Sequence, residues 1–351
     1  MTHVIGWDLG GANLKLARVE EGRVTHVAQI PCPIRQDRSK FDVALADALP
    51  SCAPGAAHAV TMTGELSDAF SDRAEGVAYL VDMMRKATDG EVLFYGARSG
   101  FLDCICAVER SSEVASANWH ASATLIAQVF PDGLLVDVGT TTTDLIPLKE
   151  GAVAVRGYSD GERLAEGELV YTGAVRTPVM AVARNARFKG RMQRIAAERF
   201  ATMADVWRLM GELPEDADPY PTPDLMGKSI EESAARLARM LGRDLNDAGL
   251  LAFIDVARDF AACQVAEIEA AAGALIAREE LDEAAPVVGA GCGRFVAQNI
   301  AKRLGRPYYD FADLIDCTPG ARAMAATCAP AVAVALLLAE TGSGPRRRKQ
   351  N

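Results

Sequence analysis

Apolar and polar residues follow a strand–turn–strand pattern at the start of the chain. Residues 3–8 are mainly apolar, Gly10-Gly11 follows, and residues 14–19 alternate apolar and polar side chains. A period of two is typical of a half-buried strand, and adjacent glycines permit a tight turn. The pattern predicts a β-hairpin with Asp8 at the end of its first strand.

The same order of features returns in the middle of the chain. Residues 134–138 predict a second apolar strand, which contains Asp137 and runs into Gly139 and four threonines. Residues 140–148 predict the return strand. The two hairpins therefore echo each other in pattern, although their residues differ too much to be called a repeat.

The remaining periodicity predicts a mixture of strands and helices, which indicates an α/β protein. Strands are expected at 58–62, 92–95 and 286–289, and helices at 67–87, 112–129, 294–304 and 321–338. Segment 183–285 is rich in Ala, Glu, Arg and Met, which predicts a helical insertion that the proline-rich loop 214–223 interrupts.

A chain of 351 residues suggests two domains at about 150 residues each. We expect a first domain at 1–129 with the first hairpin. The second, at 130–341, would hold the second hairpin, the helical insertion at 183–285 and a late glycine-rich turn. The basic end, 342–351, is expected to be a solvated, disordered tail; an interaction arm is the alternative.

Composition narrows the class. Half of the residues are hydrophobic and 24% are charged, and 37 basic against 47 acidic residues give a net charge of −10. This describes an ordinary globular protein and argues against a general nucleic-acid binder. The eight cysteines form no C-x-x-C pair and the four histidines have no partner at zinc spacing, so a structural zinc site is not expected.

Targeting signals are not apparent. The first residues do not form a signal peptide, and the longest apolar stretch, 324–339, contains Pro330 and is shorter than the roughly 20 residues that cross a bilayer. We therefore expect a cytoplasmic protein with no membrane partner. The apolar helices of 183–285 are either core or a surface for a homo-oligomer.

Anion-binding chemistry is the first functional signal. Glycines in a turn let backbone N–H groups approach an oxyanion, as Gly10, Gly11 and Asn13 would do after Asp8. Lys15 adds a positive charge, and Asp8 is of the type that holds hydrated Mg²⁺. A plain hairpin with charged flanks is the alternative.

The second turn is the more unusual one. Asp137 and Asp144 flank Gly139 and the hydroxyls of Thr140, Thr141 and Thr142, which offers metal ligands and donors around one anion. A threonine-rich β-strand would explain the threonines but neither the two carboxylates nor the glycine.

A third glycine cluster follows a short apolar strand and precedes a helix. Gly289, Gly291 and Gly293 could place a nucleotide or another anion at the helix N-terminus, or could form a simple tight turn. It is not a Rossmann fingerprint, because the third glycine comes too early.

Two such hairpins followed by a late glycine-rich turn resemble the actin, sugar-kinase and Hsp70-like ATPase superfamily. This resemblance implies a two-domain α/β, ribonuclease H-like fold with one phosphate loop in each domain. GELVYTG (167–173) and MLGRD (240–244) are similar to its hydantoinase/oxoprolinase branch. TMTGEL (61–66), SANWHASA (116–123) and EGELVYTGAVRTP (166–178) resemble a subgroup linked to tetrahydromethanopterin-dependent one-carbon transfer.

That subgroup implies an activity in methanofuran biosynthesis. Its characterised enzyme is a transferase that joins an aminomethylfuran-methyl diphosphate to the phenol of γ-glutamyltyramine, forms an aryl ether and releases diphosphate. The small-molecule partners would be that diphosphate and a phenolic acceptor, either γ-glutamyltyramine or a tyrosine-like compound. Mg²⁺ is the expected cofactor, with Asp8, Asp137 and Asp144 as its candidate ligands.

Roles for the other motif residues follow from this chemistry. A phenol of pKa about 10 needs a base, for which Glu65 and Glu168 are the candidates, and preorganised donors would stabilise the departing diphosphate. Asn118, Trp119, Tyr171, Thr172 and Arg176 are the candidate substrate-binding residues. Each also has a structural alternative: Trp119 and Tyr171 as packing, Arg176 at a strand edge, and Glu65 as a charge at a helix N-terminus.

Two other classes use the same turns. An ATP-dependent small-molecule kinase or an amidohydrolase of the oxoprolinase type would bind ATP, with Asp144 or Glu65 as a base. A non-catalytic, actin-like nucleotide switch would couple nucleotide state to partner binding. ATP consumption separates the first alternative from diphosphate release without ATP.

Overall fold

The computed structural model describes residues 3–34 and 37–341. The chain divides into two compact units. Unit 1 comprises Met1–Asp132, Leu148–Arg163 and Asp310–Asn351, and unit 2 comprises Gly133–Pro147 and Leu164–Tyr309.

A mixed sheet organises unit 1, with the strand order β3-β2-β1-β4-β5-β6. β2 is antiparallel to β1, whereas β4 lies on the other side of β1 and is parallel to it. The predicted first hairpin is thus confirmed. The strands are β1 (His3–Leu9), β2 (Asn13–Glu20), β3 (Arg23–Pro31), β4 (Ala57–Met62), β5 (Val92–Gly96) and β6 (Gly100–Leu102).

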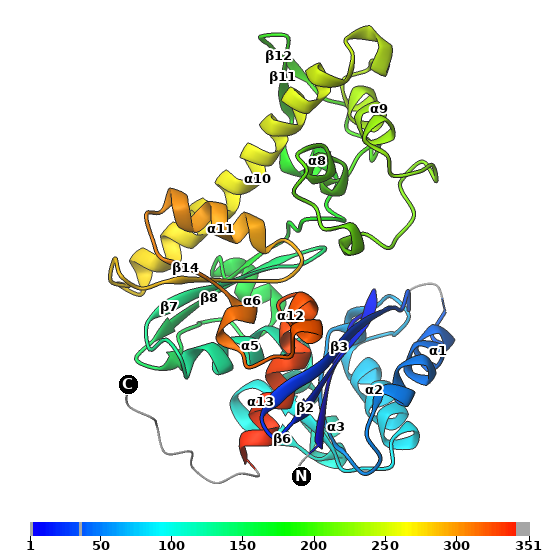
Figure 1. Ribbon diagram of the computed structural model, residues 1–351, viewed down its shortest axis with the longest axis vertical. Coiled ribbons are helices and arrows are strands. Elements are labelled where there is room, and N and C mark those ends of the chain that lie inside the picture. The colour runs from blue at the N-terminus through cyan, green and yellow to red at the C-terminus, as the bar shows by residue number, and fades with distance from the viewer. Residues whose placement is uncertain (1–2, 35–36, 342–351) are drawn as a thin grey trace. The chain divides into compact units, whose positions relative to one another are not determined.

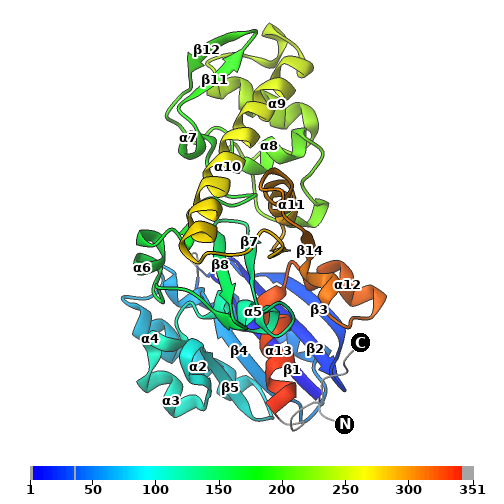
Figure 2. The ribbon, with the colours of Figure 1, turned by 90° about the vertical axis from the view of Figure 1, so that its left-hand side faces the viewer.

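Helices cover this sheet. They are α1 (Ser39–Ala48), α2 (Arg73–Ala87), α3 (Cys104–Glu109), α4 (Ser111–Val114), α5 (Asn118–Ala127), α12 (Pro319–Ala325) and α13 (Ala329–Thr341), while α6 (Asp160–Ala165) crosses the boundary between the units. α13 lies along β1, β2 and β4 (Figure 2). All of its residues from Ala329 to Ala339 are buried, as expected for a helix that is apolar on every side.

This packing changes the expected domain division. The C-terminal helices were expected in the second domain, but the segment from Asp310 belongs to unit 1 because α13 buries its apolar surface on that sheet. Leu148–Arg163 joins unit 1 as well. The predicted basic tail, 342–351, lies outside the described residues.

The sheet of unit 2 repeats the strand order of unit 1. Its order is β10-β8-β7-β13-β14, with β9 also paired to β8, and β13 is parallel to β7. The strands are β7 (Gly133–Val138), β8 (Thr143–Lys149), β9 (Ala152–Val153), β10 (Leu169–Val170), β13 (Val287–Ala290) and β14 (Tyr308–Asp310). In both sheets a hairpin strand and a parallel strand flank the first strand, which confirms the predicted ribonuclease H-like fold class.

The insertion is mostly helical, as predicted, but it also contains a small hairpin of two strands. Its elements are α7 (Val179–Val182), β11 (Asn185–Phe188), β12 (Arg191–Arg194), α8 (Met203–Leu209), α9 (Ile230–Met240) and α10 (Leu250–Arg278), and α11 (Arg294–Arg303) follows β13. α10 runs the length of the insertion and packs on β11, α8, α9 and α11 (Figure 1).

α10 is long and apolar enough, by length and composition alone, to cross a membrane. Within unit 2, however, Phe253, Val256, Phe260 and Ile268 on this helix join the buried core. Packing therefore accounts for its apolar character.

Three predicted helices differ from those in the structure, one in where it begins and two because they are broken. The helix at 67–87 begins only at Arg73, where the side chain of Asp72 accepts a hydrogen bond from the N–H of Glu75, at 2.8 Å. The helix at 112–129 is two helices, α4 and α5, and that at 321–338 is also two, α12 and α13. Short 3-10 turns occur at Leu49–Ser51, Gly64–Leu66, Ala97–Ser99, Glu215–Ala217, Leu245–Asp247 and Phe311–Leu314.

Candidate active site

The first turn joins β1 to β2 in unit 1. The N–H of Gly10 donates to the carbonyl of Asn13 at 3.1 Å, and Gly11 lies between them in the turn. Asp8 is paired across the strands with Lys15, and the Lys15 Nζ lies 3.3 Å from the Asp8 Oδ2. The predicted first-turn residues are therefore together.

Asp8 is almost completely buried, with 2% of its surface exposed. Burial raises the pKa of this carboxyl, and the charge of Lys15 opposes the shift. On the other side of β1, Thr61 pairs with Asp8. Within the described residues, Asp8 Oδ1, Asn13 Oδ1 and Thr61 Oγ1 are buried without a hydrogen-bond partner. Buried oxygen atoms of this kind require an explanation, and water, a cation or a ligand would supply one.

Glu65 follows β4 in unit 1 and is 1% exposed. Its Oε1 accepts hydrogen bonds from the N–H of Ser116 at 2.9 Å and from the Ser116 hydroxyl at 3.0 Å. Its Oε2 has no partner among the described residues. Burial raises the pKa of Glu65 to about 7, against the lowering effect of these hydrogen bonds. Glu65 lies in the first turn of a short 3-10 helix, Gly64–Leu66, and not in the first turn of α2.

The SANWHASA motif begins with the residue that holds Glu65. Ser116 has a positive φ of 53°, in the break between α4 and α5. Asn118 opens α5 and is half-buried, whereas Trp119 is 2% exposed. The Arg163 guanidinium lies 3.9 Å above the ring of Trp119, an arrangement typical of a cation–π interaction.

The second turn joins β7 to β8 in unit 2 and has the same backbone bond as the first. The N–H of Gly139 donates to the carbonyl of Thr142 at 2.9 Å. Asp137 lies near the end of β7 and is 9% exposed, while Asp144 is half-buried at the start of β8. Thr140 and Thr141 lie within the turn, their hydroxyl oxygens 3.4 Å apart.

Backbone hydrogen bonds from the EGELVYTGAVRTP motif support this turn, and we call these contacts the brace. The N–H of Ala174 donates to the carbonyl of Gly139 at 2.9 Å, and that of Arg176 to the carbonyl of Thr140 at 2.7 Å. A Cβ on Gly173 would lie 2.5 Å from the backbone nitrogen of Thr141, so only glycine permits this approach. Tyr171, by contrast, is 65% exposed.

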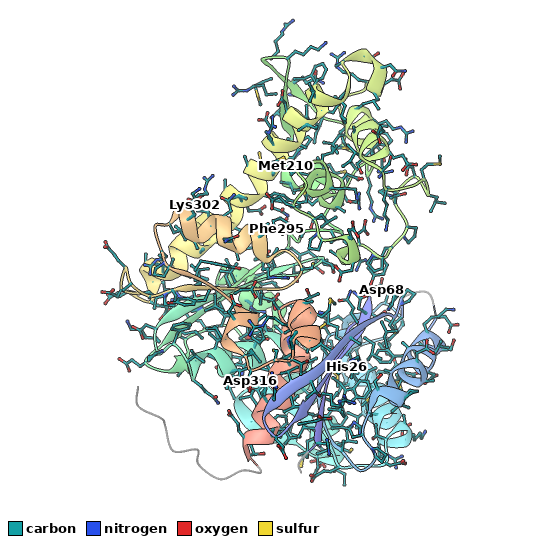
Figure 3. All side chains as sticks on the ribbon, viewed as in Figure 1. His26, Asp68, Met210, Phe295, Lys302 and Asp316 are labelled. Carbon is teal, nitrogen blue, oxygen red and sulfur yellow. The ribbon has the colours of Figure 1, made fainter. Side chains whose placement is uncertain are left out.

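A buried polar chain supports the brace. The Gln264 Nε2 donates to the Thr172 Oγ1 at 2.7 Å and to the carbonyl of Gly173 at 2.9 Å. The Gln264 Oε1 accepts from the Trp207 Nε1 at 2.8 Å. Phe295, labelled in Figure 3, packs edge-on against Trp207 with ring centroids 5.0 Å apart. Sequence reasoning missed Gln264, because nothing in a long apolar helix marks one glutamine as a support for a distant turn.

Glu168 occupies a buried ion pair. It is fully buried, and its Oε1 lies 2.7 Å from the Nη2 of Arg278 at the end of α10. Its carbonyl also accepts from the N–H of Leu145. The partner Arg278 was not predicted, because it lies far from Glu168 in the sequence.

The late glycines pack against the end of β7. A Cβ on Gly291 would lie 2.5 Å from the Asp137 Oδ1, and one on Gly293 would lie 2.5 Å from a methyl group of Val138. A Cβ on Gly289 would likewise collide with the Tyr308 hydroxyl. Close packing thus explains why each of these positions is a glycine. Nucleotide binding by this turn stays a prediction.

Metal ligands are not concentrated at one point. Among the residues that the structure describes, no group of three or more His, Cys, Asp or Glu side chains could hold a metal ion. Mg²⁺ commonly needs fewer protein ligands, because it keeps several waters and binds substrate phosphates. Asp137 and Asp144 within unit 2, and Asp8 within unit 1, suit that mode.

Comparison with known proteins gives the family and the fold. The family model described as hydantoinase/oxoprolinase matches residues 56–340. A protein of Methanocaldococcus jannaschii named (4-{4-[2-(gamma-L-glutamylamino)ethyl]phenoxymethyl}furan-2-yl)methanamine synthase is 33% identical over 243 residues, which is 69% of this chain and 72% of the relative. A protein of the same name from Methanococcus vannielii is 32% identical over 127 residues, which is 36% of this chain and 57% of that relative.

Among solved structures, a nucleotide-free acetone carboxylase superposes with a TM-score of 0.59. The match covers 95% of this chain and 70% of the carboxylase, at 9% identity. At this identity the likeness concerns the fold alone.

Proposed function

This chain belongs to the hydantoinase/oxoprolinase family, and we propose that it is a transferase of methanofuran-type cofactor biosynthesis. It would join an aminomethylfuran-methyl diphosphate to the phenol of γ-glutamyltyramine or a tyrosine-like acceptor. The single observation that carries this proposal is the similarity to the synthase of Methanocaldococcus jannaschii over 69% of the chain.

The reaction breaks one C–O bond and forms another. The furan-bound CH₂ loses diphosphate, and the furan oxygen can delocalise the positive charge that develops there. The phenol oxygen then bonds to this carbon and gives up its proton. The protein must therefore stabilise the leaving diphosphate and accept a proton.

We assign the diphosphate to the second turn. Gly139, Thr140, Thr141 and Thr142 are its proposed anion-binding residues, and the brace through Arg176 and Ala174 holds their backbone in place. Preorganised donors of this kind stabilise developing charge at little reorganisation cost. Gly10, Gly11 and Asn13, with the charge of Lys15, remain the predicted phosphate-binding turn of unit 1. Asp8 remains a predicted Mg²⁺ ligand.

Mg²⁺ fits the second turn by the chemistry of its carboxylates. Asp137 and Asp144 would hold the ion, which would neutralise charge on the diphosphate oxygens. The buried, unpartnered oxygens of Asp8 and Asn13 make the first turn the other candidate position.

Glu65 is the better candidate for the base. Its pKa of about 7 matches a group that must exchange protons near neutral pH, and its Oε2 has no partner among the described residues. Glu168 is held by Arg278 at 2.7 Å, which favours a structural role for it.

Product analysis tests the proposal. Purified protein with Mg²⁺, the furfurylamine diphosphate and γ-glutamyltyramine should release diphosphate and give the mass of the coupled ether without ATP. Asp137→Asn should lose this activity, while Asp255→Asn, an exposed position on α10, should retain it. Product formation only with ATP, together with ADP, would establish the kinase or amidohydrolase instead. Nucleotide-dependent partner capture without turnover would favour the nucleotide switch.

A further inference from the structure

A pocket of about 210 Å³ lies within unit 1, beside the loop that holds Glu65. Ala115 and Ala117 line it, and between them lies Ser116, whose N–H and hydroxyl bind Glu65. Trp119 and Tyr158 supply its aromatic surface. The same short loop thus forms part of the pocket and positions the proposed base.

One cation in this pocket has unused hydrogen-bonding capacity. The Arg98 guanidinium lies 4.3 Å over the ring of Tyr158. The charges of Glu113 and Glu162 lie near it, but within the described part of the chain Arg98 makes neither an ion pair nor a side-chain hydrogen bond. A stacked guanidinium keeps its N–H donors at its edges, where they can bind a carboxylate in a bidentate way.

A carboxylate lines the same pocket. The Glu162 Oε2 accepts hydrogen bonds from the N–H of Tyr158 at 2.9 Å and from that of Ser159 at 3.0 Å. These hydrogen bonds lower the pKa of Glu162, so it is charged at neutral pH. Glu113, also in the lining, is already paired with Arg110 at 2.8 Å.

We propose that this pocket binds the α-amino-acid end of the phenolic acceptor, with its carboxylate on Arg98 and its ammonium group on Glu162. This inference rests on the proposed function. The product named for the relatives carries a γ-L-glutamylamino group, and such a group has a free α-carboxylate and a free α-ammonium. The rest of an acceptor held in this way would extend from a pocket that is lined by the same loop that positions Glu65.

Acceptor analogues that each lack one charge test the assignment. γ-Glutamyltyramine carries both charges, 4-aminobutanoyltyramine lacks the α-carboxylate, and glutaryltyramine lacks the α-ammonium. Arg98→Gln should raise the KM for γ-glutamyltyramine by about 10- to 100-fold, the range for charge-assisted hydrogen bonds, and should leave that for 4-aminobutanoyltyramine unchanged. Glu162→Gln should raise the KM for γ-glutamyltyramine and leave that for glutaryltyramine unchanged. Arg85→Gln, an exposed position on α2, is the matched control.

Calorimetric binding of γ-glutamyltyramine, without the diphosphate, separates the pocket from the reaction. Binding that Arg98→Gln abolishes, in a protein that forms no ether, would support the pocket and refute the proposed function. If the wild-type protein forms the ether normally while Arg98→Gln raises the KM for all acceptors equally, or for none of them, the assignment of the pocket is overturned. Either result would leave the proposed function standing. No binding and no turnover by the wild-type protein would overturn both.

Discussion

The two units use one backbone frame for different chemistry. In each, an aspartate lies near the end of the first strand, and the glycine two residues later donates its N–H to a carbonyl three residues on, from Gly10 to Asn13 and from Gly139 to Thr142. The residue seven positions after the aspartate lies near the start of the return strand in both. It is Lys15 in unit 1 and Asp144 in unit 2.

This one exchange reverses the electrostatics of the turn. In unit 1 a cation 3.3 Å away neutralises the buried Asp8. In unit 2 a second carboxylate takes the place of the lysine. A turn with two carboxylates favours a divalent cation, whereas a turn with an ion pair is already neutral.

The turn after the parallel strand differs in a similar way. Thr63 in unit 1 donates its N–H to the carbonyl of Leu9 at 3.1 Å, and Gly293 in unit 2 donates to that of Val138 at 2.8 Å. The first of these turns then carries the buried acid Glu65, while the second leads into α11. The comparison teaches that the two units share the positions of these turns, and that the side chains decide which unit carries a buried acid.

The largest expected effect on the rate comes from removing either carboxylate of the second turn. Asp144→Lys and Asp137→Asn should each lower kcat about 10²- to 10³-fold, because both remove charge proposed to hold Mg²⁺ at the diphosphate. The measurement is diphosphate release at saturating Mg²⁺. Asp255→Asn provides the control at an exposed aspartate. Wild-type rates in folded variants would contradict the phosphate assignment of this turn.

The next effect concerns the acid that only unit 1 carries. The pKa of Glu65 is raised from 4.5 to about 7, so its contribution to stability is full below pH 4.5 and is lost as the pH rises through 7. Relative to wild type, Glu65→Gln should therefore gain about 3 kcal/mol in unfolding free energy between these pH values. Urea denaturation across this range measures the gain, and a pH-independent difference would contradict the buried acid.

The same residue predicts a pH–rate profile. As a base, Glu65 must be deprotonated, so kcat/KM should rise with pH up to about 7 and then level off. Glu65→Gln should lose this limb along with most of the activity. An unchanged acid limb in that variant would assign the base elsewhere.

Removing the cation of the first turn should give a smaller effect, a loss of stability. Lys15→Met leaves Asp8 buried and unpaired, and should lower the free energy of unfolding by about 2 to 3 kcal/mol, below the range for a fully buried pair because Lys15 is partly exposed. Adding Asp8→Asn should restore most of it. Urea midpoints of the two single variants and the double variant complete the cycle; additive losses would show that the pair is not coupled.

Much of the fold followed from local pattern. Strand period and the Asp–Gly turns located both hairpins, and the order of the glycine clusters predicted the fold class. What the pattern missed depended on contacts distant in sequence. The segments 112–129 and 321–338 are rich in alanine and other small residues, so periodicity alone did not reveal the breaks within them. The local pattern also could not show that α13 packs on the sheet of unit 1.

The candidate site shows the same limit. The turn residues lie close in sequence and were found together. Their supports were not, because Ser116 binds Glu65 and Arg278 binds Glu168 across long stretches of chain. Glu65 and Glu168 were therefore equal candidates in the sequence, and only their partners separate them: hydroxyl and N–H donors for one, a guanidinium for the other.

The smallest expected effect tests whether the brace of unit 2 matters to catalysis. Thr172→Val removes the hydroxyl that accepts from Gln264 at 2.7 Å, while Gln264 keeps its bond to the carbonyl of Gly173. One lost hydrogen bond should lower stability by about 1 kcal/mol. Because the brace holds the backbone of the threonine turn, kcat should also fall about 3- to 10-fold. Ser122→Ala is the matched control, since the Ser122 hydroxyl is buried without a partner among the described residues. Lower stability with an unchanged kcat would make the brace purely structural, and the second turn would then owe its geometry to the hairpin alone.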